Sequence, residues 1–176
     1  GIPNAAEVLH QLRAAGLPAT MVWPTLEAAN HWLVVTMPKD WRVRTGFKAQ
    51  ALCKRIGEIV FGGHMGQGMT KIIVLEDDVD ATDTMEVVWA FATRCHPGPE
   101  GEILFDGQTN AALSVYLADN DKKTGTAQKA VLNGLTRDEW TGGATPRRLA
   151  PPCACARGGP SPSRFSASSC CLRRAR

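Results

Sequence analysis

One segment, residues 71–98, constrains the fold more than any other part of the chain. Its first five residues, 71–75, are apolar almost without a break, which is typical of a strand that is buried on both faces. A cluster of acids follows, and then a helical pattern that Asp83 or Thr82 is placed to cap. Pro97 and Gly98 end that helix. A buried strand, a short turn and a helix in this order indicate an α/β fold.

The rest of the first 140 residues contains the same two kinds of element, without an internal sequence repeat. The apolar spacing predicts the order helix, strand, strand, helix, strand, helix, strand, strand. Besides the segment above, the predicted helices cover residues 5–15 and 47–61, and the predicted strands cover residues 19–23, 30–37, 113–117 and 129–132. We therefore predict one α/β domain over residues 1–140, with a mixed sheet flanked by helices.

The last part of the chain, residues 141–176, has a different composition. It holds seven Arg, no Lys and no acid, whereas residues 1–140 hold 13 Lys and Arg against 17 Asp and Glu. Such an Arg-, Pro-, Cys- and Ser-rich stretch buries too little apolar surface to fold, so we predict a disordered basic tail. A frameshift or gene-model error explains this tail best, and a genuine basic arm is the alternative. Because the domain itself is acidic, we predict no nucleic-acid binding by it.

Composition also bears on the cellular compartment. No apolar run approaches the roughly 18–20 residues that cross a bilayer, and no secretory signal opens the chain, so we predict no membrane association. Cys53 and Cys95 are far apart in the domain and are expected to be reduced thiols, which predicts a cytoplasmic protein. The chain begins with Gly1 and not with Met, so we expect a fragment, a processed product or an incomplete gene model.

The acids of residues 77–83 allow a metal hypothesis, because hard cations bind clustered carboxylates. The spacing does not match an EF-hand loop, which needs Gly at its sixth position and Glu at its twelfth. The favoured interpretation is structural: acids after a strand end complement the dipole of the following helix. We therefore predict no metal ligand in this segment.

The glycine-rich stretch 62–68 resembles a phosphate loop only superficially. A P-loop needs Lys directly after its last Gly and leads from a strand into a helix, whereas Met69 follows Gly68 and the stretch leads from a helix into a strand. Two interpretations stay open, a loop that lines a ligand site and a plain connection. His64 lies in this loop and is a candidate site residue.

Several segments resemble one family, in the same order along the chain. They are residues 1–7, 15–18, 27–35, 55–61 and 71–98, and less clearly 115–117 and 129–132. Together they resemble the UbiD-type carboxy-lyases, which use prenylated FMN to remove CO2 reversibly from aromatic or acrylic acids. The fungal cinnamic-type and the protocatechuate-type decarboxylases are the most similar members. The resemblance covers about residues 1–140 and ends in the basic tail.

The resemblance implies that this chain is the C-terminal α/β domain of such an enzyme. In the family that domain supports self-association and closes over the substrate. The acid–base residues and the ligands of metal and flavin phosphate belong upstream, so no catalytic, cofactor-binding or metal residue is assigned here. Prenylated FMN, a divalent metal and, as a further candidate, potassium would be bound by the full-length parent. Its expected partners are an aromatic carboxylic acid and further copies of itself.

Four positions match the wall of the family's substrate pocket. Ile2 precedes the first helix, Gln67 lies in the glycine-rich loop, and Ala111 and Leu113 come shortly before a predicted strand. Cinnamic-type members have aromatic residues where Gln67 and Ala111 stand here. A polar and a small residue there suit a phenolic acid with ring hydroxyls better than a plain styrene-like acid.

The resemblance therefore implies part of a non-oxidative, reversible decarboxylase of aromatic or acrylic acids, and we expect this part to be inactive alone. The first alternative is a non-catalytic interaction or oligomerisation domain that is retained without its enzymatic half. The second is a nucleic-acid binder that uses the basic tail, which would show a steep salt dependence of binding. The identity of the acid and the size of the oligomer do not follow from the residues.

Overall fold

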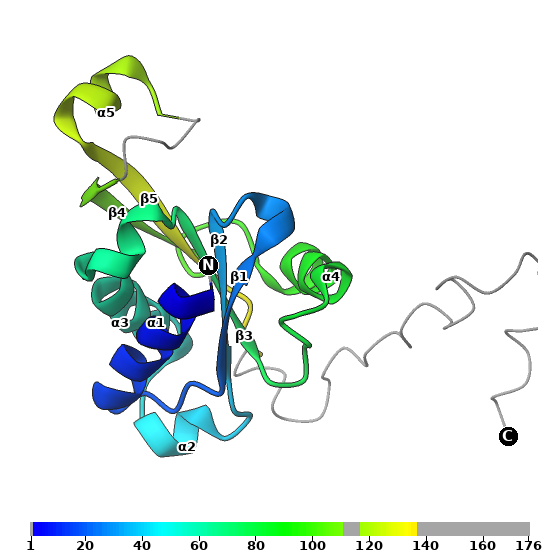
Figure 1. Ribbon diagram of the computed structural model, residues 1–176. Coiled ribbons are helices and arrows are strands. Elements are labelled where there is room, and N and C mark those ends of the chain that lie inside the picture. Colours follow the sequence, from blue (N-terminus) through cyan, green and yellow to red (C-terminus); the bar gives the residue numbers. More distant parts are fainter. Residues whose placement is uncertain (1, 111–116, 137–176) are drawn as a thin grey trace, which may run out of the picture.

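The computed structural model describes residues 2–110 and 117–136 (Figure 1). These residues form a five-stranded sheet with helices on both of its faces. The elements are α1 (Ile2–Ala14), β1 (Met21–Thr25), the 3-10 helix η1 (Leu26–Ala28), β2 (Trp32–Met37), α2 (Trp41–Thr45), α3 (Ala49–Gly62), the 3-10 helix η2 (His64–Gly68), β3 (Lys71–Glu76), α4 (Thr84–Arg94), β4 (Glu102–Thr109), α5 (Asp119–Thr124) and β5 (Thr126–Asn133). The predicted α/β class is confirmed.

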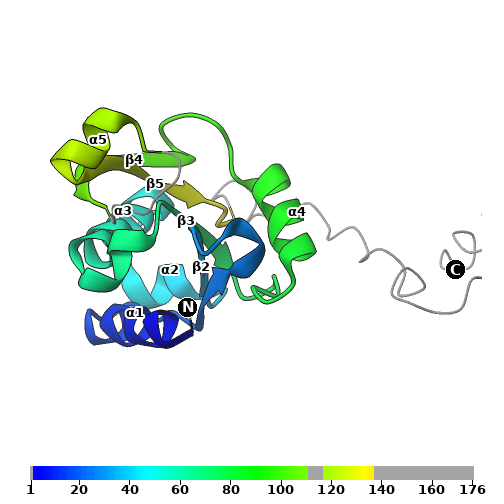
Figure 2. The same ribbon diagram turned by 45° about the horizontal axis from the view of Figure 1, so that its top comes forward.

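The sheet is mixed, as predicted, and its strands lie in the order β1-β2-β3-β5-β4. The three central strands β2, β3 and β5 are parallel, and the edge strands β1 and β4 each run antiparallel to their neighbour. Helices α1 and α3 cover one face of the sheet and α4 covers the other (Figure 2). Because β2 and β3 are parallel neighbours, their amino ends lie side by side, and Trp32 pairs with Lys71.

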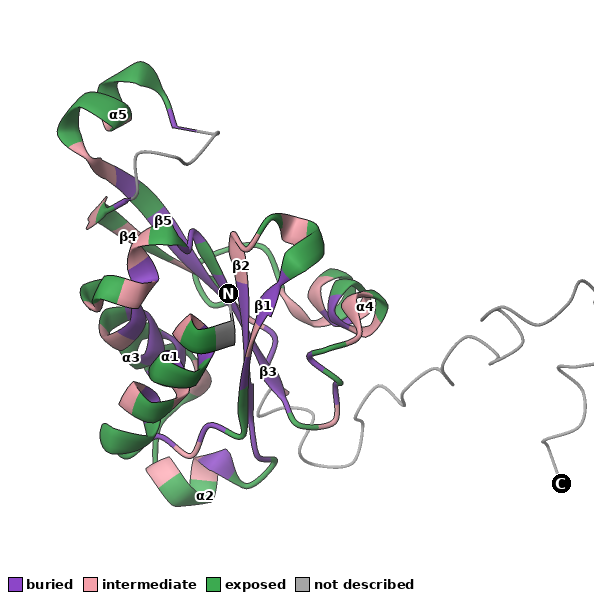
Figure 3. Ribbon diagram, in the orientation of Figure 1, coloured by how far each residue is buried: buried purple, intermediate pink, exposed green. Residues whose placement is uncertain are grey.

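Strand β3 is buried on both faces, which confirms the prediction from its apolar run (Figure 3). Ile72 and Val74 face the α1 and α3 side, where they belong to the larger apolar cluster. Ile73 and Leu75 face α4 and belong to the smaller cluster. A central parallel strand between two helical layers has no solvent-facing side, and this explains the unbroken run.

The acidic turn after β3 starts α4, as predicted. The carboxylate of Asp83 accepts a hydrogen bond from the Met85 N–H, 3.0 Å away, so Asp83 is the N-cap and Thr82 is not. Such a bond satisfies one of the N–H groups that a helix start leaves without a partner. The carboxylate of Asp80 accepts two hydrogen bonds from Thr82 and stabilises the turn itself.

Other boundaries differ from the predictions, and the reasons are local. Strand β1 continues through Pro24, because an edge strand tolerates a residue without an N–H. Helix α1 begins at Ile2, three residues before the predicted start at residue 5. The sequence missed α2, which is only five residues long, and α5, which is six.

Strand β4 was also missed. Its inward residues Ile103 and Phe105 alternate with solvent-facing residues, and Gly107 introduces a bulge that interrupts the pattern. The predicted strand at 129–132 is part of β5. Residues 113–116 of the other predicted late strand lie outside the described residues, and so does the basic tail. Among the helices that the structure describes, none is long and apolar enough to cross a membrane.

Candidate functional site

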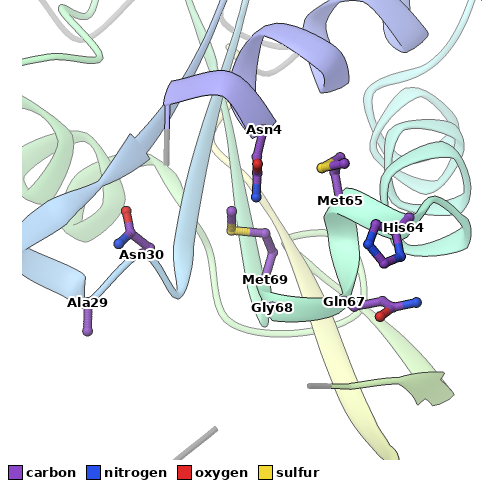
Figure 4. A pocket seen from close by; sticks show the side chains of 8 residues that line it. All are labelled: Asn4, Ala29, Asn30, His64, Met65, Gln67, Gly68 and Met69. Carbon is purple, nitrogen blue, oxygen red and sulfur yellow. The ribbon is translucent and has the colours of Figure 1, made fainter. Parts of the chain in front are cut away.

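A cavity of about 320 Å³ lies at the amino ends of β2 and β3 (Figure 4). Three segments form it: the first turn of α1, the turn between η1 and β2, and the stretch from η2 to the start of β3. The side chain of Asn4 points toward Met69, and His64 and Gln67 lie on the η2 side. The lining residues are Asn4, Ala29, Asn30, His64, Met65, Gln67, Gly68 and Met69.

The η2 wall is held against the end of α3 by close backbone packing. Gly66 is buried, and a Cβ atom at this position would overlap the backbone carbonyl of Val60. The Gly66 N–H donates to the Gly63 carbonyl at 3.1 Å, and the Met69 N–H donates to the Gly66 carbonyl at 3.1 Å. Only glycine allows this approach, so the glycine-rich sequence produces a compact wall.

A buried lysine lies behind this wall. Lys129 on β5 is 1 % exposed, and its ammonium donates to the carbonyls of Gly66 at 2.7 Å and Gln67 at 3.2 Å. Its Nζ also lies 5.2 Å from the centre of the Phe61 ring, within the range of a cation–π contact. Removal from water disfavours the charged form and lowers the pKa of Lys129 to about 8.

The opposite wall contains an unusual backbone turn. Ala29 and Asn30 both have positive φ angles, 51° and 59°, which residues other than glycine seldom adopt. The turn is closed by the Asn30 N–H, which donates to the Thr25 carbonyl at 3.1 Å. The side-chain oxygen of Asn30 is buried and has no hydrogen-bond partner among the described residues. Strained backbone and an unsatisfied buried acceptor both occur preferentially at functional sites.

The two walls are joined through His31. Its carbonyl accepts hydrogen bonds from the N–H groups of Thr70 at 3.2 Å and Lys71 at 3.1 Å. The hydroxyl of Thr70 also donates to this carbonyl, at 3.3 Å. The start of β2 and the start of β3 therefore cannot separate easily, and the shape of the cavity is set by the sheet.

The lining contains several polar side chains. Amide and imidazole groups come from Asn4, Asn30, His64 and Gln67, and two methionines add polarisable apolar surface. None of the lining residues is an acid, a lysine or an arginine. A carboxylate or a phosphate would therefore find no lysine or arginine here, whereas an aromatic ring with a polar substituent fits the available groups.

The residues also do not fit a flavin phosphate or a divalent metal. In the described ranges 2–110 and 117–136, no three His, Cys, Asp or Glu side chains come together as metal ligands do. Of the acids in residues 77–83, Asp80 accepts from Thr82 and Asp83 caps α4. Asp78 and the neighbouring Glu76 on β3 also have partners. Asp78 forms a two-point ion pair with Arg94, at 3.0 and 2.6 Å, and buried Glu76 accepts a hydrogen bond from the Trp41 indole at 3.1 Å.

Of the four predicted wall positions, the structure describes one side chain in this cavity, that of Gln67. Ile2 is the first residue of α1, next to the cavity in sequence, but its side chain lies outside the description. Ala111 and Leu113 fall in the undescribed range 111–116. The role of all four in substrate binding stays a prediction. The candidate His64 lines the same cavity as Gln67.

The sequence reasoning missed Asn4, Asn30, Met69 and Lys129. Asn30 had one available signal, because asparagine is enriched in the left-handed conformation that this turn requires. Asn4 stands just before the predicted helix of residues 5–15 and is instead inside α1. Nothing local marks Lys129, since the carbonyl of Gly66 that it binds is 63 residues away in the sequence.

Comparison with known proteins gives a consistent result. Residues 1–134 match the model of the 3-octaprenyl-4-hydroxybenzoate carboxy-lyase C-terminal domain, the C-terminal domain of the UbiD family. The pyrrole-2-carboxylic acid decarboxylase of Pseudomonas aeruginosa is 35% identical over 142 residues, which are 81% of this chain and 28% of that protein. Ferulic acid decarboxylase 1 of Saccharomyces cerevisiae is 28% identical over 137 residues, 77% of this chain and 27% of that protein. The chain spans about a quarter of the length of these relatives.

Solved structures share the fold at lower identity. The enzyme HmfF from Pelotomaculum thermopropionicum, solved with FMN, superposes with a TM-score of 0.66 at 18% identity, over 88% of this chain and 31% of that one. The 3,4-dihydroxybenzoic acid decarboxylase AroY of Klebsiella pneumoniae gives a TM-score of 0.63 at 17% identity, over 81% of this chain and 29% of that one. At this level of identity the likeness is one of fold.

Proposed function

Because the chain belongs to the UbiD carboxy-lyase family, as its C-terminal domain, we propose that it forms one wall of the acid-binding site in a flavin-dependent decarboxylase. The observation that carries this proposal is the cavity between α1, η2 and the start of β2, with Gln67 in its lining. The substrates would be aromatic or heterocyclic carboxylic acids, as the names of the two curated relatives suggest.

Within that site, this chain would contact the ring of the acid and not its carboxylate. The lining offers neutral amides, an imidazole and two thioethers, which can bind a ring N–H or hydroxyl and pack against an aromatic face. A carboxylate needs a cation or several N–H donors, and these would come from the part of the enzyme that the chain does not cover.

The chemistry would also depend on that other part. Prenylated flavin, a divalent metal and, as a further candidate, potassium would be held there, since the cavity lining offers no acid, lysine or arginine to bind them. The flavin would supply the reactive centre for loss of CO2, and the residues of this chain would bind and orient the ring and exclude water from it. We therefore expect the chain to be inactive alone. When it is mixed with prenylated FMN and either pyrrole-2-carboxylate or ferulate, the CO2 released should not exceed that of a blank without the chain.

A binding experiment tests the proposal directly. Pyrrole-2-carboxylate is titrated into the isotope-labelled 176-residue chain, and the amide signals are followed by NMR. We expect shifts at residues 64–69 and at Asn30, and none on the solvent side of α4. Gln67→Ala should weaken binding about 2- to 10-fold, the usual effect of one lost hydrogen bond. The matched control Gln50→Ala, on the surface of α3, should leave the affinity unchanged. Shifts confined to other surfaces would overturn the proposal.

A second proposed role is self-association, for which the exposed face of α4 is the supporting observation. Met85 and Val88 lie three residues apart on this helix and are 70% and 40% exposed. A second copy of the chain is the proposed partner, and an evolved form of HmfF is described as dimeric. Light scattering should show a dimer for the chain and a shift toward monomer for Met85→Glu.

A further inference from the structure

Lys129 carries a charge in the interior that the proposed function does not use. It is the one buried basic side chain in the described part of the molecule. No carboxylate among the described residues lies within ion-pair distance of its ammonium. A buried charge without an opposite charge costs stability, and an apolar side chain of similar size would cost less. Stability alone therefore does not account for a lysine at this position, and its contacts indicate what else it does.

Those contacts all point to one segment. Both hydrogen bonds of the ammonium go to carbonyls of η2, on Gly66 and Gln67, and its ring contact is with Phe61 just before η2. Lys129 is absent from the cavity lining, so its ammonium lies behind the wall. The carbonyl of Gly66 also accepts from the Met69 N–H, which makes this oxygen the central acceptor of the segment.

The sheet gives Lys129 a fixed position from which to act. Its backbone lies on β5, where it pairs with Phe105 on β4, and the neighbouring Ala130 pairs with Lys71 at the start of β3. A short 3-10 segment has poor internal hydrogen-bond geometry and depends on outside contacts for its shape. The bonds from Lys129 are charge-assisted and therefore stronger than neutral ones.

We propose that Lys129 is a positioning residue of the acid-binding site, and that its ammonium holds η2 so that Gln67 and Gly68 form the cavity wall. This inference rests on the proposed function for the identity of the site. The role is indirect, because Lys129 touches the wall and not the ligand. Its lowered pKa agrees with a charge that is held in place against its desolvation cost.

Hydrogen exchange of the full chain tests the inference without any ligand. In Lys129→Met, which keeps the length but has no donor, the Gly66 and Met69 amides should exchange about 10-fold faster or more. Lys129→Gln can still donate to one carbonyl and should restore part of the protection. Urea unfolding of Lys129→Met should show a midpoint equal to or above that of the wild type, because a buried unpaired charge is removed. Lys54→Met, at an exposed position on α3, is the matched control and should change neither quantity.

The outcomes separate this inference from the function on which it rests. Unchanged exchange of the Gly66 and Met69 amides in Lys129→Met overturns the inference; if that variant does not fold, unchanged exchange in Lys129→Gln does so. If pyrrole-2-carboxylate binds the wild type and Lys129→Met equally well despite faster exchange, the role in the acid site is wrong. If it does not bind the wild type at all, the proposed function fails, while the exchange data still decide whether Lys129 holds η2.

Discussion

The two faces of the sheet are stabilised in different ways. The face under α1 and α3 is a continuous apolar layer, whose fully buried members include Leu12, Leu33 and Ile56. The face under α4 has a smaller apolar cluster, and polar contacts at its rim add to it. These include the Asp83 cap and the ion pair between Asp78 and Arg94.

The two faces also differ in the partners of their buried or partly buried basic side chains. On the α4 side Arg94 has a carboxylate partner and lies over the Trp89 ring at 5.5 Å. On the α3 side Lys129 has only backbone carbonyls and an aromatic ring. The ion pair of Arg94 links α4 to the turn after β3. A buried charge without a carboxylate partner, such as Lys129, is more often found at a functional site. The cavity lies beside the second of these.

The largest expected effect comes from a matched pair on β3. Ile72 and Ile73 are neighbours, both are 0% exposed, and they face opposite sides of the sheet. Truncation to Ala should cost about 2–5 kcal/mol at either position, from lost apolar burial and the cavity left behind. Ile72→Ala should be near the upper end, because the larger cluster can relax less around the gap. Urea unfolding measures both, with Leu104→Ala as an exposed control. An equal or larger loss at Ile73 would remove the proposed difference between the faces.

The same contrast explains which elements the sequence could predict. Strand β3 and the cap of α4 could be predicted because their signals are local. The strand is an unbroken apolar run, and the cap is an acid two residues before the N–H from which it accepts a hydrogen bond. Strand β4 lies at an edge, and half of its side chains face solvent, so Ile103 and Phe105 alone carry its pattern. Its bulge at Gly107 breaks the alternation that would have identified it.

The cavity was predictable only in part, for a related reason. For the glycine-rich loop, lining a ligand site was one of two open interpretations, and Gln67 was assigned to a pocket wall from the family resemblance; both line the cavity. Asn4 and Asn30 reach the cavity because α1 and the start of β2 meet there, and this depends on the order of the strands. The position of Lys129 behind the cavity wall depends on β5 lying beside β3, which no local pattern specifies. Long-range strand order is the information that the sequence pattern lacks.

The second prediction concerns the unpaired charge and alkaline pH. The pKa of Lys129 is about 8 in the folded chain and about 10.5 when unfolded. Between these values the unfolded chain holds a proton that the folded chain has released. The contribution of Lys129 to the free energy of unfolding therefore rises with pH, by up to about 3 kcal/mol. Burial raises the pKa of Cys95 to about 11 and that of Cys53 further, and these thiols act in the opposite direction above about pH 9.

The measurement is therefore a difference between two variants. Urea unfolding of wild type and Lys129→Met is compared from pH 7 to 10.5, where the thiols contribute equally to both. The advantage of Lys129→Met should shrink as the pH rises and should be smallest near pH 10.5. A constant difference across this range would show that the ammonium is not destabilised by burial.

The smallest expected effect is on the paired charge of the α4 side. Burial raises the pKa of Asp78, but the hydrogen bonds and the charge of Arg94, together with Lys39, outweigh this and leave the pKa below its usual value. The stabilisation is therefore complete above the unfolded pKa of about 4 and is lost as the pH falls through the lower folded pKa. Arg94→Met, which keeps much of the apolar stem, should cost about 1–2 kcal/mol at pH 7, since both partners are partly exposed.

An exposed ion pair elsewhere in the molecule is the matched comparison for Arg94. Arg44 pairs with Asp40 at 2.8 Å, but the two side chains are 56% and 52% exposed. Arg44→Met should therefore cost only about 0–1 kcal/mol at pH 7 and leave the acid limb of the stability curve unchanged. Arg94→Met should flatten that limb below about pH 4, because Asp78 then titrates closer to its ordinary pKa. Equal losses in the two variants would mean that the pair beneath α4 behaves as a surface pair, and that apolar contacts alone attach this helix to the sheet.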